Sequence, residues 1–354
     1  MRSNIMAPAA TQASRPHLDA LTAQGRALLG TDLAILGGAM TWVSDHQLVS
    51  AISNAGGFGV IACGAMTPEL LAAEISKTQA LTKAPFGVNL IVMHPQLDEL
   101  ASVCVEQGVS HVVLAGGLPK PQIISKIIDA GRKVIAFAPS ASIGKRLVRN
   151  GVDGLVIEGS EAGGHVGPVS TSVLAQEILP EITDVPIFVA GGIGHGNAIA
   201  AYLRMGAAGV QLGTTFVCAE ETNAHPAFKE RFIRANARDA VTSVQVDPEF
   251  KVIPVRALAN DATRAFQAKQ IEVIDAYRRG ELTFQAASLE IEHFWAGALR
   301  RAVVDGDVDN GSLMAGQSVG MVKSIRPVQT ILNELADSAE AALSGSAAAT
   351  AKAV

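Results

Sequence analysis

The stretch KVIAFAPSASIGKRLVRNGVDGLVIE, residues 133–158, holds the pattern that decides the fold. It begins with the apolar run Lys133–Phe137, continues through a segment that ends at Gly151, and returns to a second apolar run at Gly154–Ile157. Neither run alternates apolar and polar residues, which is typical of parallel strands buried on both faces. Because glycine supplies the left-handed residue that ends a helix, we expect a strand–helix–strand unit here.

The same unit repeats in both directions from this stretch. Further apolar runs of this kind begin at Leu33, Phe58, Phe86, His111, Val185 and Gly209. The segments between them carry helix-start signals, such as Thr67-Pro68-Glu69 and a predicted capping box formed by Ser44 with Gln47. Five helices are predicted to end at a glycine: Gly56, Gly108, Gly131, Gly151 and Gly206.

Eight strand–helix units predict an α/β fold, a closed (β/α)8 TIM barrel. A doubly wound sheet is the alternative. That fold usually has G-x-G-x-x-G after its first strand, whereas the first strand here is followed by Gly37-Gly38-Ala39-Met40.

The ends of the chain and the stretch after the eighth strand depart from this pattern. Helical periods cover residues 228–236, 262–279 and 289–304, and a last helix over 319–336 is expected to close the ring. We therefore expect a mobile leader (1–16), a barrel core (17–217), a helical cap insertion (218–310), a barrel-closing segment (311–336) and a loose tail (337–354).

Composition excludes several classes of protein. Hydrophobic residues make up 49% of the chain, which predicts a large folded core, yet no apolar run reaches the ~18 residues that cross a membrane. A net charge of −5 without a Lys/Arg run argues against a nucleic-acid partner. The three cysteines, Cys63, Cys104 and Cys218, form neither a disulfide framework nor a metal-ligand cluster. We expect a cytoplasmic protein without a metal centre.

Reactive groups of a barrel lie where its strands end. The run Glu158-Gly-Ser-Glu161-Ala-Gly-Gly164-His165 follows the sixth strand, and His165 is the one side chain of this loop that titrates near neutrality. The alternative is a histidine that only hydrogen-bonds backbone. For Glu161 the alternative is a charged loop residue that only contacts solvent.

Two glycine-containing turns follow the last two strands, at Ala190–Gly194 and Gly213–Thr215. Backbone N–H groups in such turns bind phosphate in many barrels, although tight turns without a ligand are the alternative. Asn89, in the third strand, offers a donor and an acceptor together, as a flavin pyrimidine edge requires. A structural tie between loops explains Asn89 equally well.

The residues Gly38–Asp45, Asn54–Gly59, Pro85–Asn89, Glu158–His165, Ala190–Ile193 and Gly213–Phe216 resemble the nitronate monooxygenase / 2-nitropropane dioxygenase superfamily of FMN-dependent barrels. Two further stretches, 221–229 and 306–317, are most similar to the flavin-dependent (type II) enoyl-[acyl-carrier-protein] reductases. Ala138-Pro139-Ser140 also follows the reductase pattern, where nitronate monooxygenases often have a His-Lys pair. Thr215 departs from it, because the reductases usually place arginine there.

This resemblance implies that His165 is catalytic and faces the substrate. It also implies a set of FMN-binding residues, comprising Gly38, Met40, Asn89, Glu158, Gly164, Gly191, Gly192, Gln211, Gly213 and Thr214.

The activity implied by the resemblance is a hydride relay from NADH or NADPH through FMN to an enoyl-thioester, either a small molecule or bound to an acyl carrier protein. Arg278-Arg279 and Arg300-Arg301 are candidates for docking an acidic carrier. Oxidation of alkyl nitronates by O2 on the same cofactor is the alternative, and a flavin- or carrier-binding module without turnover is a third. The sequence leaves open a monovalent cation and a homodimer.

Overall fold

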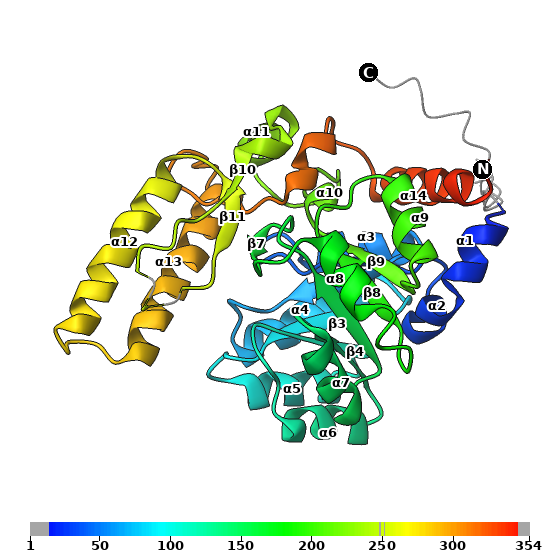
Figure 1. The fold of residues 1–354 in the computed structure, drawn as a ribbon, viewed down its shortest axis with the longest axis horizontal. Helices are drawn as coiled ribbons and strands as arrows, with labels where there is room; N and C mark the ends of the chain where they lie inside the picture. The colour runs from blue at the N-terminus through cyan, green and yellow to red at the C-terminus, as the bar shows by residue number, and fades with distance from the viewer. Residues whose placement is uncertain (1–13, 248, 251, 346–354) are drawn as a thin grey trace, which may run out of the picture.

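Eight parallel strands close into a barrel, as the sequence predicts (Figure 1). The computed structural model describes residues 14–345 except 248 and 251. The barrel closes where Ile35 and Leu36 pair with Val210 and Gln211. In ring order the strands are β1 (Ile35–Gly37), β2 (Phe58–Ala62), β3 (Gly87–Ile91), β4 (His111–Ala115), β5 (Lys133–Phe137), β6 (Gly154–Glu158), β8 (Ile187–Ala190) and β9 (Gly209–Leu212).

Helices surround this ring and alternate with its strands. The predicted cap at Thr67 is confirmed, since its hydroxyl accepts from Leu70 N–H, and the five predicted helix-ending glycines all have positive φ. The helices up to the end of the barrel are α1 (Pro16–Leu21), α2 (Ala23–Leu29), α3 (His46–Asn54), α4 (Pro68–Leu81), α5 (Leu97–Glu106), α6 (Pro121–Asp129), α7 (Ala141–Arg149), α8 (Thr171–Ile178), α9 (Gly196–Arg204) and α10 (Thr214–Val217).

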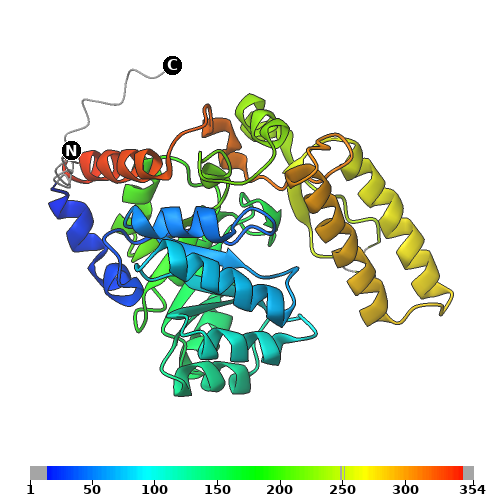
Figure 2. The same cartoon turned by 180° about the vertical axis from the view of Figure 1, so that it is seen from behind.

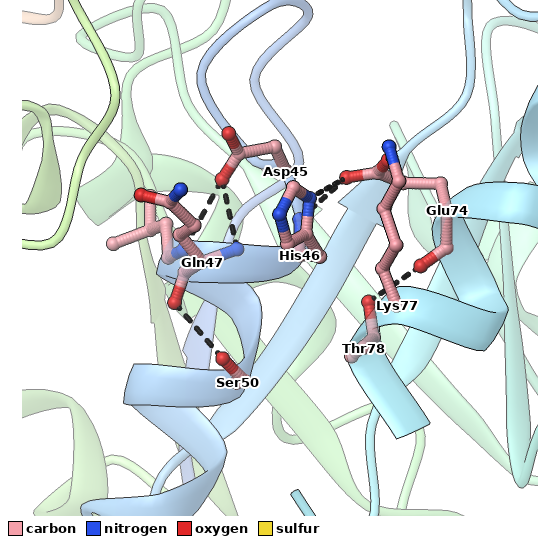
Figure 3. A network of polar contacts seen from close by, with 8 residues as sticks. Asp45, His46, Gln47, Ser50, Glu74, Lys77 and Thr78 are labelled. Carbon is pink, nitrogen blue, oxygen red and sulfur yellow. Dashed lines mark hydrogen bonds and ion pairs between the residues drawn. The ribbon is translucent and has the colours of Figure 1, made fainter. Parts of the chain in front are cut away.

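The start of α3 differs from the predicted capping box. Asp45, not Ser44, is the N-cap, and its carboxylate accepts from the backbone N–H groups of Gln47 and Leu48 (Figure 3). The Ser44 hydroxyl accepts from Met40 N–H at 3.0 Å and donates to Gly38 O at 3.3 Å. Ser44 therefore stabilises the loop after β1 rather than the helix.

Alternate strand residues face two different apolar layers. Phe58, Val60, Val113, Val156 and Phe188 belong to one buried cluster, which fills the inside of the barrel. Their neighbours along the strands belong to the larger cluster packed against the helices. Each large apolar side chain buried in this way stabilises the fold by about 1.5–3 kcal/mol.

The insertion after β9 contains a small sheet in addition to the predicted helices. Its antiparallel order is β10 (Ala240–Thr242), β11 (Val255–Leu258) and β7 (Gly164–His165), so the loop after β6 contributes one strand. The sequence predicts the helices of this insertion but not its strands, because strands of two to four residues carry no readable periodicity.

Three helices occupy the positions that the sequence predicts for the insertion: α11 (Pro226–Arg234), α12 (Asp261–Arg278) and α13 (Phe284–Val303). A short 3-10 helix, η1 (Ala237–Asp239), precedes β10. Both views show α12 and α13 as a pair that extends away from the barrel (Figures 1 and 2). No helix among residues 14–345, as described, is both long and apolar enough to pass through a bilayer.

The last predicted helix is divided in two. η2 (Gln317–Met321) is separated from α14 (Val328–Leu343), because Pro327 disfavours helical backbone at the residue before it. α14 continues to Leu343 with Ala339 fully buried, so residues 337–343 are not the loose tail that the sequence suggests. The remaining predicted tail from 346 and the leader up to residue 13 lie outside the described residues.

Candidate functional site

The loops after β6 and β8 meet at the carboxyl end of the barrel. Thr171 N–H and its hydroxyl both donate to the Glu161 carboxylate, at 2.8 and 2.9 Å. The Thr171 hydroxyl also lies 3.1 Å from Gly191 O. The half-buried Glu161 is therefore a tie between two loops, not the solvated charge that its sequence context allows.

Two predicted phosphate-binding glycines lie against this tie. Gly191 and Gly192 have φ of +98° and +70°, which side chains rarely adopt. A Cβ on Gly191 would lie 2.7 Å from the Thr171 hydroxyl, and one on Gly192 would lie 3.0 Å from Glu161 Cβ. Only glycine lets the turn after β8 approach the loop after β6 this closely.

The ends of β1 and β9 bring together four more of the predicted residues. A Cβ on Gly38 would lie 3.2 Å from the Gln211 side chain, and one on Gly213 would lie 3.5 Å from the Met40 sulfur. Thr214 follows directly and accepts a hydrogen bond from Gly316 N–H at 2.9 Å. The predicted residues from the first and last strands are thus neighbours.

Asn89 is buried in β3, and its amide donates to Val113 O at 3.3 Å. This bond fits the structural-tie interpretation, and it leaves the Asn89 carbonyl oxygen without a hydrogen bond from any described residue. The structural tie and the flavin contact are therefore compatible.

Three polar side chains at these strand ends have no hydrogen bond from the part of the chain that the structure describes. They are the half-buried Glu158, the buried Gln211 amide and the buried Thr215 hydroxyl. Burial raises the pKa of Glu158 to about 8, so its carboxyl group is largely protonated at neutral pH. Buried polar groups are normally paired, so a polar ligand is the natural partner for this set.

These features fit the flavin that the sequence implies. Glu158, Gln211 and Asn89 offer donors and acceptors at the ends of three strands, and Thr215 offers a hydroxyl beside Gly213 and Thr214. Uncharged donors of this kind can face a heteroaromatic ring and a polar side chain without leaving a buried charge unpaired.

His165 is exposed on β7, opposite Val255 of β11. Its neighbour Gly164 has φ of +78°, and a Cβ there would lie 3.4 Å from the Met314 sulfur. β7 follows β6 along the chain and lies between the barrel and β11 (Figure 1). The strand that carries His165 thus lies between the barrel and the insertion.

Two further imidazoles lie at strand ends and were not among the predicted site residues. His94 follows β3 and accepts from Gln96 N–H at 3.1 Å, while His195 is the N-cap of α9 and accepts from Asn197 N–H. Both use a ring nitrogen to hold a local turn. Cys63, at the end of β2, is buried, and burial raises the pKa of its thiol to about 12, which agrees with a packing role.

The candidate docking arginines of the insertion all have partners within it. Arg278 pairs with Asp247, Arg279 with Glu281 and Arg300 with Asp305, and Arg301 donates to Asn310 O. Among the residues that the structure describes, no group of three or more His, Cys, Asp and Glu side chains is arranged to hold a metal ion.

The polar groups at the barrel mouth are compatible with a flavin, and similarity to known proteins gives the class of enzyme. The family model described as nitronate monooxygenase matches residues 24–338, so the chain belongs to this family. The chain is a flavin-dependent oxidoreductase.

Individual relatives carry different activities in their names. The chain is 30% identical over 335 residues, 87% of its length and 93% of the relative, to a hydroxy-methyl-oxo-octahydro-indene-carboxyl-CoA dehydrogenase of Mycobacterium tuberculosis. It is 27% identical over 83% of its length to a probable nitronate monooxygenase of Bacillus subtilis, covering 92% of that protein. Among solved structures, FabK from Thermotoga maritima matches with a TM-score of 0.81 and 35% identity, over 90% of this chain and 96% of FabK.

Proposed function

We propose that the chain uses NADH or NADPH to reduce the carbon–carbon double bond of an enoyl-thioester, with FMN as its flavin. One proton and one hydride are added, giving the saturated acyl-thioester and oxidised nucleotide. When bound, FMN supplies the hydride transfer. The likeness to FabK, an enoyl-ACP reductase, supports the direction of the reaction, and the carboxyl-CoA relative supports a thioester substrate.

The observation that carries the proposal is the difference between the segments that follow β5 and β6. His165 lies on the loop after β6, whereas the end of β5 has buried Ala138 and a Ser140 that caps α7. An imidazole on one side of the site can hydrogen-bond a thioester carbonyl and stabilise the enolate charge that develops when hydride adds to the β-carbon.

The other residues bind and orient. Gly191, Gly192, Gly213 and Thr214 hold the phosphate, with backbone N–H groups and a hydroxyl as donors. The neutral Glu158 carboxyl donates a hydrogen bond without placing a negative charge beside the ring.

The test is anaerobic mixing of the yellow, flavin-loaded protein with one reactant at a time. The proposal expects NADH or NADPH to bleach the flavin and crotonyl-CoA to restore its colour. His165→Ala should keep the flavin and the first step but slow the second step by about 100-fold, the usual size of a general acid–base contribution. Equal loss of both steps, or of neither, contradicts the role of His165.

Nitronate oxidation is the second candidate, supported by the family match and by the probable nitronate monooxygenases among the relatives. It predicts that propyl-2-nitronate bleaches the flavin faster than either nucleotide does. A third outcome is that a saturated acyl-CoA bleaches the flavin. The chain would then catalyse the reverse reaction, as a dehydrogenase, which is the activity in the name of the carboxyl-CoA relative.

The carrier of the thioester is tested separately. Because the insertion arginines already have partners, an acidic acyl carrier protein has to compete with Asp247, Glu281 and Asp305 for them. Charge reversal at Arg279 and Arg300 should raise KM for a carrier-bound substrate and leave KM for crotonyl-CoA unchanged. Equal effects on both substrates would remove the docking surface from the proposal.

A further inference from the structure

Arg256 of β11 reaches from the insertion into the loop that carries His165. Its Nε donates to Ser160 O at 2.9 Å and its Nη1 donates to Ala240 O at 2.6 Å. Arg256 is only 9% exposed. A buried charge with backbone partners on two separate segments is unusual, because burial of an ion is unfavourable unless its hydrogen bonds are well formed.

The same residue holds the other end of this loop through its backbone. Arg256 pairs with Gly164, Val255 pairs with His165, and Val166 N–H donates to Pro254 O at 2.9 Å. The side chain therefore fixes the start of the loop at Ser160 while the backbone fixes its end. The imidazole of His165 stands at the end of a loop clamped twice by one residue.

We propose that Arg256 is a positioning residue that sets where His165 stands at the barrel mouth. The inference rests on the function proposed for His165, and Arg256 itself does not contact the substrate. Its effect passes through the loop 159–165.

The chemistry of the guanidinium explains why an arginine occupies this position. Ser160 O and Ala240 O lie on different segments, and a rigid fork of donors reaches both, whereas a lysine ammonium on a flexible stem is not pre-organised to do so. The acidic group that faces it is Glu161, whose carboxylate is already held by Thr171. Arg256 and Glu161 thus secure the loop towards the insertion and towards the barrel, respectively.

A purely structural anchor makes a different prediction from a positioning residue. If Arg256 only attached the insertion, its removal would lower the melting temperature and leave the His165-dependent step intact. If it positions His165, its removal changes kcat only while His165 is present.

The experiment is a double-mutant cycle on the flavin-loaded, full-length protein, with NADH and crotonyl-CoA as substrates. Its variants are Arg256→Met, His165→Ala and the double substitution. We expect Arg256→Met to lower kcat about 10-fold in the native background and less than about 2-fold beside His165→Ala, as residues that act as a unit do. KM for NADH should stay within about 2-fold. Arg256→Lys, which keeps the charge, should recover part of kcat, and it takes the place of Arg256→Met in the cycle if the latter does not fold.

Hydrogen–deuterium exchange gives a readout that does not depend on the reaction. Arg256→Met should speed exchange of the backbone amides in residues 159–166. Arg264→Met is the matched control, because Arg264 is a 76% exposed arginine of the same insertion whose one ion pair with a described residue is with Asp261.

The proposal would be overturned if Arg256→Met lowered kcat by the same factor with and without His165→Ala. Unchanged hydrogen–deuterium exchange in residues 159–166 would also overturn it. If His165→Ala alone leaves kcat unchanged, the proposed function of His165 fails. Hydrogen–deuterium exchange alone then tests whether Arg256 restrains the loop 159–165. A failure of the role of His165 can therefore be distinguished from a failure of the role of Arg256.

Discussion

The backbone N–H of Gly316 donates a 2.9 Å hydrogen bond to the hydroxyl of Thr214, a residue 102 positions earlier in the chain. Gln317 N–H, next along the chain, donates to Glu161 O at 2.9 Å. The segment that leaves the insertion therefore joins the loop after β6 to the start of α10. Because Thr214 uses its oxygen as the acceptor in this bond, its hydroxyl hydrogen can still donate to another group.

This relationship predicts a large effect from one methyl group. In Gly316→Ala the added Cβ would lie 2.8 Å from Glu161 O and 3.0 Å from Gly163 N. We expect a loss of about 1–3 kcal/mol in the free energy of unfolding, as overpacking usually gives, together with weaker flavin binding. Thermal unfolding with and without FMN and a fluorescence titration measure both.

Gly167→Ala is the control for this substitution, because the exposed Gly167 has no atom within 4 Å of an added Cβ and lies a few residues along the chain from Glu161 and Gly163. If the two alanine variants behave alike, the segment around Gly316 does not restrain the site.

A second prediction concerns the unpartnered hydroxyl of Thr215. Thr215→Val removes a buried donor that no described residue uses, so the flavin-free protein should be as stable as the native protein or slightly more stable. If the hydroxyl binds the flavin phosphate, the Kd for FMN should rise by about 10-fold, the equivalent of one lost hydrogen bond to a charged group.

Thr222→Val serves as the opposite case. The Thr222 hydroxyl donates to Phe216 O at 2.8 Å, so its removal should lower the melting temperature and leave the Kd for FMN unchanged. An unchanged Kd in Thr215→Val would show that this hydroxyl does not contact the cofactor.

The barrel was predictable from the sequence because each buried parallel strand is a short apolar run, and five of the strands (β2, β4, β5, β6 and β9) follow a helix-ending glycine. β2, β4, β5 and β9 begin at the predicted residues. The N-cap of α3 was not predictable in the same way. Ser44 and Asp45 are adjacent and both are common N-cap residues, so the backbone conformation determines which of them caps the helix.

The site was predictable only in part, because some of its contacts join residues that are far apart in the sequence. The loop Glu158–His165 carries its own glycines and its imidazole, so a local motif reveals it. Its restraint by Arg256 spans 96 positions and ends on a backbone carbonyl, which has no signature in the residue types. Short-range patterns therefore reveal the strand ends, but not what holds them together.

A third prediction follows from the Glu158 carboxyl. Burial raises its pKa from 4.5 to about 8 in the folded protein, so between these pH values the folded state binds more protons than the unfolded state. The stability of the flavin-free protein should therefore fall as pH rises from about 5 to 8. Glu158→Gln removes this dependence.

Melting temperatures of the native and Glu158→Gln proteins, both stripped of flavin, test this directly. The melting temperature of Glu158→Gln, relative to that of the native protein, should increase as pH rises. A constant difference between pH 5 and pH 8 would mean that Glu158 is ionised in the fold throughout.

The last prediction concerns the ion pair between α3 and α4. His46 donates to Glu74 Oε1 through its backbone N–H, and its ring Nδ1 lies 2.6 Å from the same oxygen (Figure 3). Burial alone would raise the pKa of Glu74, but the hydrogen bonds and charge of His46, with the charge of Lys77, outweigh it and lower the pKa below 4.5. Glu74→Gln should lower the free energy of unfolding at pH 7 by about 1–3 kcal/mol, as the loss of a buried, charge-assisted hydrogen bond does.

The sign of the pH dependence separates this tie from ordinary packing. A lowered pKa in the folded state stabilises the protein above the unfolded value of 4.5, and this contribution is lost as the pH falls through the folded value. In urea unfolding, the gap between the native protein and Glu74→Gln should therefore narrow below about pH 4.5. Lys77→Ala is the control, since its 58% exposed ammonium lies 3.5 Å from Glu74 and an exposed pair contributes at most about 1 kcal/mol. A pH-independent gap would assign the effect of Glu74→Gln to altered packing rather than to the bond with His46.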